Sequence, residues 1–440
     1  MRAGGWSLTG LALLVTWPAR GQEPAEPPVP EPEEVTPPPD LVDLDLRLKR
    51  TEELVLNRQP TVTWSGYVDF GFFVPQGNGA GYVQDFAHAR FPQYADRFGW
   101  VFLGDILAPA VNTRGEVADL GDAPGVDRFD SINSRGKPGF ILNEANFVLR
   151  SALTSSALVT ASFNLVPRTG SDFRLGDFFD LDIAQLEWMP TASQRTSIFV
   201  GKTDSVIGIE YRERKSQKRF GITPSLIARY TTGPALGLKV RSKFGPEDLV
   251  VVAGAVTNGS NTTEQFHFYD EIDSNAGKTV SGRVSLQTPT SIHVEAGFSG
   301  SWGAQDRSLS SDDAMWFMGP DLIVRAGLLE LKAQWLRGKA PGSDAEQVYG
   351  LNLRGGGYAE ADLTFGPSLG VYGRGEYRDA DVWLGTERYY RTRSWRATVG
   401  ARWVFTERAV VKAEYLHNGE YGNLPQVPND VFTSSLVLSY

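Results

Sequence analysis

From Thr61 to the last residue, apolar and polar side chains alternate along the chain in segments of about ten residues. The chain ends on the stretch VFTSSLVLSY, in which Phe432, Leu436, Leu438 and Tyr440 share one mostly apolar face. A period of two is the period of a β-strand and not of a helix. A strand at the very end of a chain leaves an open edge unless it pairs with another strand. We therefore expect the last strand to pair with the first strand, near Thr61, and to close a barrel.

The same alternation recurs along the chain and marks sixteen segments that we expect to be strands. Their predicted ranges are 61–73, 140–151, 156–166, 178–189, 196–203, 234–244, 248–257, 278–287, 291–302, 315–327, 328–337, 351–365, 368–378, 393–405, 408–418 and 430–440. An even number of strands would leave both ends of the barrel on the same side of the membrane.

The connections between these segments alternate between short and long. Turns such as 190–194 and 245–248 are tight, whereas the connections 204–233, 258–277 and 379–392 are long and mostly polar. Outer-membrane barrels sort their connections in this way, with short periplasmic turns and long external loops. A segment of about ten residues also has the length of a tilted strand that crosses a bilayer. The sequence therefore predicts an all-β fold, a transmembrane antiparallel β-barrel of sixteen strands.

One region between the first two predicted strands leaves the strand number open. Residues 74–139 form a large insertion, which we expect at the mouth of the barrel or in its lumen. Within it, the stretch FGWVFLGDIL at 98–107 also has the pattern of a strand. If that stretch crosses the membrane with a partner, the barrel has eighteen strands instead of sixteen.

The part of the chain before the barrel differs from the rest in composition. Residues 1–21 carry one early charge and then an apolar stretch, which is typical of a secretory signal peptide. Residues 22–40 are rich in Pro and Glu and predict an extended linker. Residues 41–58 have apolar residues at heptad spacing, which predicts a short amphipathic or coiled-coil helix in the periplasm and hints at a homotrimer. The barrel domain is expected at 59–440.

The chain has no cysteine, and an exported chain without cysteine points to a bacterial envelope rather than a disulfide-stabilised secreted domain. We expect the mature protein in the bacterial outer membrane, after cleavage of the signal peptide. Tyr440, Leu438, Leu436 and Phe432 resemble the C-terminal signal by which bacterial outer-membrane barrels are recognised for assembly. The expected partners are therefore the barrel-assembly machinery, outer-membrane lipid and lipopolysaccharide, and two further copies of the chain.

Three stretches in the middle of the chain resemble bacterial outer-membrane porins. They are VGKTDSVIGIEY with Gly201, Lys202, Gly208 and Glu210, then PALGLKV with Pro234 and Gly237, then VVAGAVTNGSN with Asn258 and Gly259. The resemblance covers roughly residues 200–260 and is nearest to the phosphate-selective porins and related β-barrel porins. It implies a passive channel, and the short helix before the barrel also fits this group.

Charge inside the barrel is the remaining functional signal. A sixteen-stranded barrel has a water-filled lumen with polar inward positions, where the predicted register puts eleven basic and ten acidic residues. Because these totals nearly cancel, selectivity must come from clustering, and rings of Arg and Lys are how anion pores select. The candidate residues for lining the pore and contacting anions are Lys239, Arg241, Lys243, Arg212, Arg214, Lys215, Lys218, Arg219, Arg396 and Arg402.

Five of these candidates lie in the connection YRERKSQKRF before the strand at 234–244. If this connection folds into the lumen, it builds a basic constriction. The alternative is that it stays outside in water and binds the phosphates of lipopolysaccharide.

No set of residues with catalytic or metal-ligand spacing stands out. The four histidines are scattered, and neither a phosphate-binding loop nor a nucleophile elbow is complete. The net charge of −9 gives no support to nucleic-acid binding. We expect an outer-membrane porin that passes small hydrophilic solutes with a weak anion preference, without enzymatic activity, cofactor or metal. The competing functions are an outer-membrane barrel enzyme of the lipase or protease type and a structural or adhesive barrel with a blocked lumen.

Overall fold

The computed structural model of this chain describes most of the barrel domain. The described residues are 62–75, 82–83, 99–100, 139–165, 179–258, 275–288, 290–304, 314–345, 350–422 and 430–440. The predicted signal peptide, linker and helix at 1–21, 22–40 and 41–58 lie outside these residues and stay predictions.

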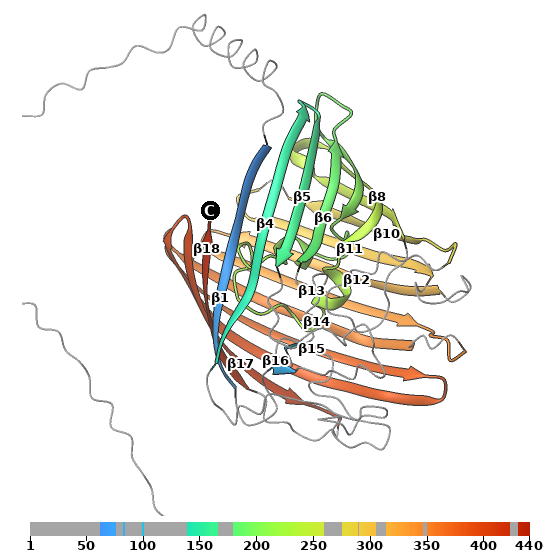
Figure 1. The fold of residues 1–440 in the computed structure, drawn as a ribbon, viewed down its shortest axis with the longest axis vertical. Coiled ribbons are helices and arrows are strands. Elements are labelled where there is room, and N and C mark those ends of the chain that lie inside the picture. The colour runs from blue at the N-terminus through green and yellow to red at the C-terminus, as the bar shows by residue number, and fades with distance from the viewer. Residues whose placement is uncertain are drawn as a thin grey trace, which may run out of the picture. The chain divides into compact units, whose positions relative to one another are not determined.

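Sixteen antiparallel strands form a closed barrel, in which the first strand pairs with both the second and the last. Figure 1 shows them following one another around the wall in chain order. The strands are β1 Val62–Pro75, β4 Gly139–Thr154, β5 Ala157–Leu165, β6 Phe179–Trp188, β7 Thr196–Thr203, β8 Ala235–Phe244, β9 Val250–Thr257, β10 Thr279–Gln287, β11 His293–Ala304, β12 Ala314–Ala326, β13 Leu329–Ala340, β14 Gly350–Phe365, β15 Leu369–Leu384, β16 Glu387–Thr406, β17 Ala409–Glu420 and β18 Val431–Ser439. The predicted all-β barrel of sixteen strands is confirmed.

The alternative of eighteen barrel strands is wrong. Within 98–107, the described residues Gly99–Trp100 form the short strand β3, which pairs only with β2 at Tyr82–Val83 in a separate two-stranded sheet. The other residues of the predicted insertion, apart from those at the ends of β1 and β4, lie outside the described part of the chain.

The expected long connection at 379–392 is also wrong. β15 continues to Leu384 and β16 begins at Glu387, so that only a two-residue turn joins them. The polar composition of this stretch predicts a loop, but its residues pair across the hairpin from Asp379↔Arg393 to Asp381↔Arg391. Strands that extend beyond the bilayer are exposed to water, so charged residues can occupy both of their faces.

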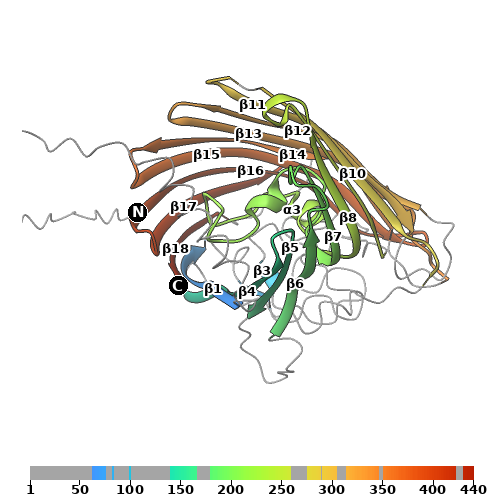
Figure 2. The same cartoon turned by 90° about the horizontal axis from the view of Figure 1, so that it is seen from above.

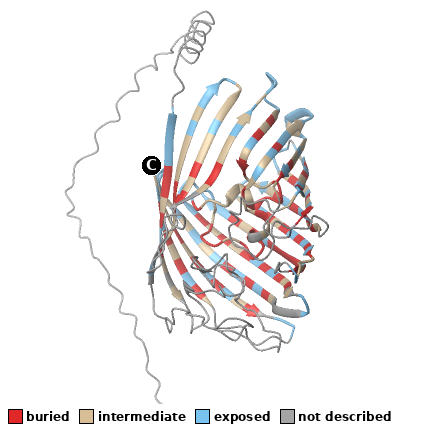
Figure 3. Cartoon of the chain, turned by 45° about the vertical axis from the view of Figure 1, so that its right-hand side comes forward, coloured by how far each residue is buried: buried red, intermediate tan, exposed pale blue. Residues whose placement is uncertain are grey.

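The two faces of the wall differ as the alternating pattern predicts. On β8, the outward side chains Leu236, Leu238 and Val240 are 40%, 46% and 36% exposed, whereas Lys239 between them is 9% exposed. Figure 3 shows the same alternation of buried and exposed positions along the strands. An outer face of large exposed apolar residues is what a barrel presents to lipid, and the polar residues therefore face the inside.

The last residue closes the barrel. Tyr440 N donates to Gly66 O at 3.0 Å, and Gly66 N donates to Tyr440 O at 3.2 Å. The Tyr440 ring lies 5.6 Å from that of Trp64, and it also lies over the space where Gly66 has no Cβ. A side chain at Gly66 would meet both the Tyr440 ring and the Asn146 carbonyl oxygen at less than 3 Å.

Replacing Gly66 by valine is therefore expected to weaken the seam between β1 and β18, because the added side chain must displace Tyr440 or the β4 backbone. Overpacking of this kind costs about 1–3 kcal/mol. The measurement is the temperature at which the compact, faster-running band is lost in unboiled gel samples. Gly375→Val on β15 is the matched control, since a Cβ at Gly375 meets nothing within 4 Å. Equal loss of the folded band in both variants would contradict the prediction.

Candidate functional site: a partition inside the barrel

The connection between β7 and β8 lies inside the barrel. We call residues 204–234 the partition. It contains two short helices, η3 at Glu210–Glu213 and α3 at Ala228–Thr231, and Figure 2 shows α3 within the ring of strands. Neither helix, nor any other helix in the described part of the chain, has the length and apolar character needed to cross a membrane. The expected alternative of a connection that stays outside in water does not hold, because the partition binds inward side chains of the wall.

The first half of the partition is bound to the wall by ion pairs on two sides. The guanidinium of Arg214 donates to both carboxylate oxygens of Asp182 on β6, at 2.6 and 2.9 Å. Lys215 Nζ lies 2.7 Å from the same carboxylate, whose side chain has no exposed surface. Five strands farther round the wall, Arg212 donates to both oxygens of Glu295 on β11, each at 2.9 Å. Paired geometry of this kind compensates the cost of burying the charges.

The second half of the partition is bound mainly through its backbone. Lys412 Nζ on β17 donates to the carbonyl oxygens of Ser216, Arg219 and Gly221 at 2.6, 2.6 and 2.9 Å. The neighbouring Glu414 accepts hydrogen bonds from the backbone of the next two residues of the partition. An irregular segment must find partners for its backbone groups wherever water is excluded. The wall supplies these partners from β17.

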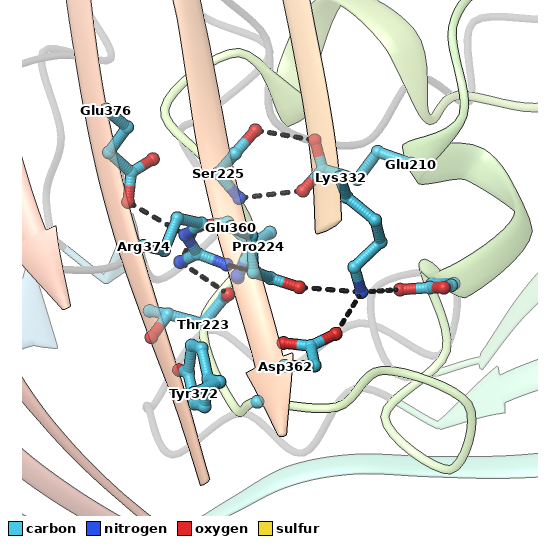
Figure 4. A network of polar contacts seen from close by, with 12 residues as sticks. Glu210, Thr223, Pro224, Ser225, Lys332, Glu360, Asp362, Tyr372, Arg374 and Glu376 are labelled. Atoms are coloured by element: carbon cyan, nitrogen blue, oxygen red, sulfur yellow. Dashed lines mark hydrogen bonds and ion pairs between the residues drawn. The ribbon is translucent and has the colours of Figure 1, made fainter. Parts of the chain in front are cut away.

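Two further strands bind the partition near Pro224. Arg374 on β15 donates to Thr223 O at 2.9 Å, and Arg396 on β16 donates to Pro224 O at 2.6 Å. Glu376 accepts from Leu226 N at 2.6 Å and from Arg396 Nε at 2.7 Å. Figure 4 shows Thr223, Pro224 and Ser225 beside Arg374 and Glu376.

One lysine joins three carboxylates at the other end of this network. Lys332 Nζ on β13 lies 2.8 Å from Glu213. It also lies 2.6 Å from Glu360 and 2.9 Å from Asp362 (Figure 4). Glu360 also pairs with Arg374 at 3.2 Å. The charges of η3, β13, β14 and β15 therefore form one connected network.

The two halves of the partition are also joined to each other. Ser225 donates its backbone N–H and its hydroxyl to Glu210, at 2.7 and 2.5 Å. Burial raises the pKa of the Glu210 carboxyl, and these two hydrogen bonds lower it in part. Ile209, Leu226 and Ile227 are at most 3% exposed. With an apolar centre and charged contacts at its edges, the partition is a folded element of the lumen.

The three basic residues predicted on β8 have different surroundings. Lys239 is buried, donates to Asp204 O at 3.1 Å and lies over the Phe199 ring. Lys243 lies 2.6 Å from Asp248 in the turn after the strand, and the hydrogen bond from Lys243 lowers the pKa of that carboxyl. Arg241 is 3.7 Å from Glu187, and its side chain is 47% exposed. All three alternate with the exposed Leu236, Leu238 and Val240, and Arg241 is the most accessible of the three.

The other predicted site residues fall into two groups. Arg212, Arg214, Lys215 and Arg396 each have a carboxylate partner within 3 Å. Lys218, Arg219 and Arg402 have no ion pair with any described residue. The guanidinium of Arg402 lies 5.8 Å from the centre of the Phe220 ring, and that of Arg219 donates to Arg214 O at 3.1 Å.

Sequence reasoning missed Asp182, which binds two of the predicted basic residues. Strict alternation along β6 assigns Asp182 to the opposite face from Glu187. In the structure, Ser162 pairs with Ile183 and Phe163 with Leu181, so Asp182 is the extra residue of a β-bulge. A bulge reverses the alternation locally, and it turns this carboxylate toward the lumen. The sequence signal for this bulge is that simple alternation would place an acidic residue, Asp182, on the face toward lipid.

The described residues offer little to the alternative of a barrel enzyme. His417 Nδ1 lies 2.8 Å from Asp430, but among the described residues no Ser or Thr hydroxyl forms a hydrogen bond with this histidine. Asp430 is shared with the hydroxyl of Tyr415 and the backbone of Asn418. No three His, Asp or Glu side chains within the described ranges are arranged to hold a metal ion.

Solved structures with a similar fold are outer-membrane channels and porins. DcaP of Acinetobacter baumannii, described as an outer membrane channel, is 10% identical, with 87% of this chain and 97% of that chain covered at a TM-score of 0.50. OmpF of Salmonella typhi, solved with daunomycin, is 10% identical, with 87% and 98% covered at 0.51. OprB of Pseudomonas putida is 10% identical, with 90% and 97% covered at 0.51. At this identity the similarity concerns the fold alone.

The sequence comparison identifies the family. No curated protein matches the chain. The family described as "Putative beta-barrel porin-2, OmpL-like" matches residues 154–435, which is more than half of the chain and runs from the end of β4 into β18. This range includes the whole partition and the wall from β5 to β17 that binds most of it. A closed barrel of sixteen strands with an apolar outer face and a charged interior agrees with that match, and the chain belongs to this family of outer-membrane porins.

Proposed function

We propose that the protein is a passive diffusion channel for small hydrophilic solutes and that the partition sets the size of its pore. The observation that carries this proposal is the binding of residues 204–234 to inward side chains of strands spread around the barrel, β6, β11, β15 and β17. At least six strands separate β6 from β15 in either direction around the ring. Solutes must pass beside a folded element instead of through an open lumen. The polar wall and the water it holds favour hydrophilic solutes.

The direct test is the swelling of liposomes that contain the purified protein, in sugars of increasing mass. We expect swelling in small sugars and a sharp cut-off. No swelling in any sugar would favour the structural or adhesive barrel with a blocked lumen. No catalytic role is proposed, and release of fatty acids or peptides by the purified protein would favour the barrel enzyme.

A weak anion preference is proposed to come from one group of cations, which we call the Phe220 cluster: Lys218, Arg219 and Arg402. Lys412 beside them is buried and its ammonium is bound by three carbonyl groups, so it supports the cluster but does not contact solutes. Lys412 donates to the carbonyl oxygens on both sides of Phe220, and Arg402 lies opposite Lys412 in the β16–β17 register. Among the described residues, none of the three cluster members has a carboxylate within ion-pair distance. Lys243 and the cations in the first half of the partition have close acidic partners, and Lys239 is buried, so they contribute less.

Replacing Arg219 and Arg402 together by glutamine is expected to lower the anion-to-cation permeability ratio roughly twofold in low salt. The ratio is measured from the zero-current potential in a salt gradient. The effect should shrink at physiological salt, because charges are screened over about 8 Å there. Lys243→Gln is the matched control, since that ammonium is already bound by Asp248. A larger effect from the control would show that the anion path follows β8 instead.

The assembly of the protein is also part of the proposal. We infer that residues 1–21 are removed on export, which N-terminal sequencing of the mature protein would test. The heptad pattern of residues 41–58 supports a homotrimer, which cross-linking in native membranes would test. The barrel-assembly machinery is proposed to bind the C-terminal residues Tyr440, Leu438, Leu436 and Phe432. If it does, a chain without Tyr440 should accumulate unassembled in the periplasm.

A further inference from the structure

The outward face of β13 changes from apolar to basic along its length. Leu331 and Trp335 face outward and are 39% and 37% exposed, and Leu336 and Ala340 face inward and are 1% and 0% exposed. Arg337 and Lys339 follow Trp335 on the outward face, and both are exposed. A lipid-facing Arg or Lys costs roughly 2–4 kcal/mol at the midplane of a bilayer and little near its surface. These two residues must therefore lie near a membrane surface.

Trp335 marks the depth of that surface. Its indole N–H donates to the Tyr377 hydroxyl at 2.7 Å, and Tyr377 is opposite Trp395 in the β15–β16 register. Exposed Trp and Tyr side chains of this kind gather at the level of the lipid headgroups. With a rise of about 3.4 Å per residue, Arg337 lies about 7 Å and Lys339 about 14 Å beyond Trp335 along the strand.

The surface in question is the outer one. β13 begins after the short turn at Gly327 and Leu328, and Lys339 lies at its other end, before the longer connection to β14. The end of β13 with Lys339 lies at the same rim of the barrel as the end of β7, where the partition begins. The start of β1 and Tyr440 lie at the other rim. In outer-membrane barrels, the end with the long connections faces the outside of the cell.

No described acidic residue neutralises this pair. On β12, the residues opposite Arg337 and Lys339 are Met318 and Trp316. Neither base has a hydrogen bond or ion pair with a described residue. By contrast, Arg354 on β14 lies 2.5 Å from Asp381. Arg337 and Lys339 therefore present two accessible positive charges just above an aromatic anchor.

We propose that Arg337 and Lys339 bind the phosphate groups of a lipopolysaccharide molecule in the outer leaflet. A guanidinium can bind a phosphate with two parallel hydrogen bonds, and an ammonium adds a point charge beside it. Leu331 and Trp335, directly below, provide an apolar surface for the acyl chains of the same lipid. The site faces away from the lumen, so it is separate from the proposed solute path and does not depend on the Phe220 cluster.

The test is the affinity of the purified, folded protein for two probes, bis-phosphorylated lipid A and lipid A from which both phosphates have been removed, measured by native mass spectrometry in detergent. We expect the unmodified protein to prefer the phosphorylated probe. We expect Arg337→Gln with Lys339→Gln to weaken its binding about tenfold or more, as one lost charge-assisted contact of about 1.4 kcal/mol implies. Binding of the dephosphorylated probe should not change.

The matched control is Arg408→Gln in the turn between β16 and β17, an exposed residue at the opposite end of the barrel. It should bind both probes as the unmodified protein does, and all variants should keep the compact gel band and the same conductance. Equal binding of the two probes by the unmodified protein would overturn the proposal. So would full retention of binding by the double variant, or equally tight binding of phosphatidylglycerol.

Discussion

Removal of most of the partition is expected to raise the single-channel conductance by a factor of roughly three or more, because ion flow depends on the open cross-section of the pore. The variant lacks residues 207–230 and keeps Asp204 to Val206 and Thr231 to Pro234 as a short link between β7 and β8. The measurement is the current through single channels in a planar bilayer.

The barrel itself should survive this deletion. The ladder between β7 and β8 runs from Thr196↔Ser242 to Thr203↔Ala235 and does not involve the removed residues. Wall charges such as Glu376 and Lys412 lose their partition partners, but the water that fills the lumen can solvate them. As a control, the variant and the unmodified protein are compared for the compact gel band and for strand content by circular dichroism. A folded variant with unchanged conductance would contradict the role of the partition as the narrowest part of the pore.

Loss of both cations at Asp182 is expected to release the first half of the partition from β6. In the variant Arg214→Met with Lys215→Met, the buried carboxylate keeps only neutral donors such as the Ser162 hydroxyl at 3.2 Å. Breaking a buried ion pair from one side costs about 3–5 kcal/mol, because the remaining charge is uncompensated. We expect faster hydrogen exchange of the backbone at residues 204–216 and larger fluctuations of the single-channel current.

The matched compensating variant adds Asp182→Leu to the same two substitutions. With the buried charge removed, the partition should regain part of its protection from exchange. Arg241→Met is a second control, because its ion pair is long and its side chain is half-exposed. The double variant could also keep the exchange rates of the unmodified protein at residues 204–216. That result would show that Lys412 and the charges of β15 and β16 hold the partition without Asp182.

The sequence predicted the barrel wall well because the relevant signal is local. Each membrane-crossing strand must show apolar residues to lipid at every second position, and this pattern is visible within ten residues. The ends of β7, for example, agree with the predicted range to the residue. The prediction failed for the hairpin of β15 and β16, since the pattern is lost where strands leave the membrane and both faces are wet.

The candidate site was only partly predictable. The basic stretch from Arg212 to Arg219 drew attention by its charge density alone, and its entry into the lumen was one of two alternatives. The partners of these residues were not predictable. Asp182 faces inward only because of a bulge that β6 forms opposite β5. Nothing near Lys412 in the sequence shows that its ammonium binds three carbonyl groups almost two hundred residues away.

By itself, the sequence determined the all-β barrel, a choice between sixteen and eighteen strands, the face that most of the strands show to lipid and the closure at Tyr440. These properties follow from a period of two that every strand must satisfy separately. Only the tertiary structure decided that residues 204–234 cross the lumen, which of their cations are neutralised and which stay available. Those properties depend on contacts between residues far apart in the chain, where closure of the barrel brings wall charges from opposite sides onto one segment. Such contacts leave no periodic trace in the sequence.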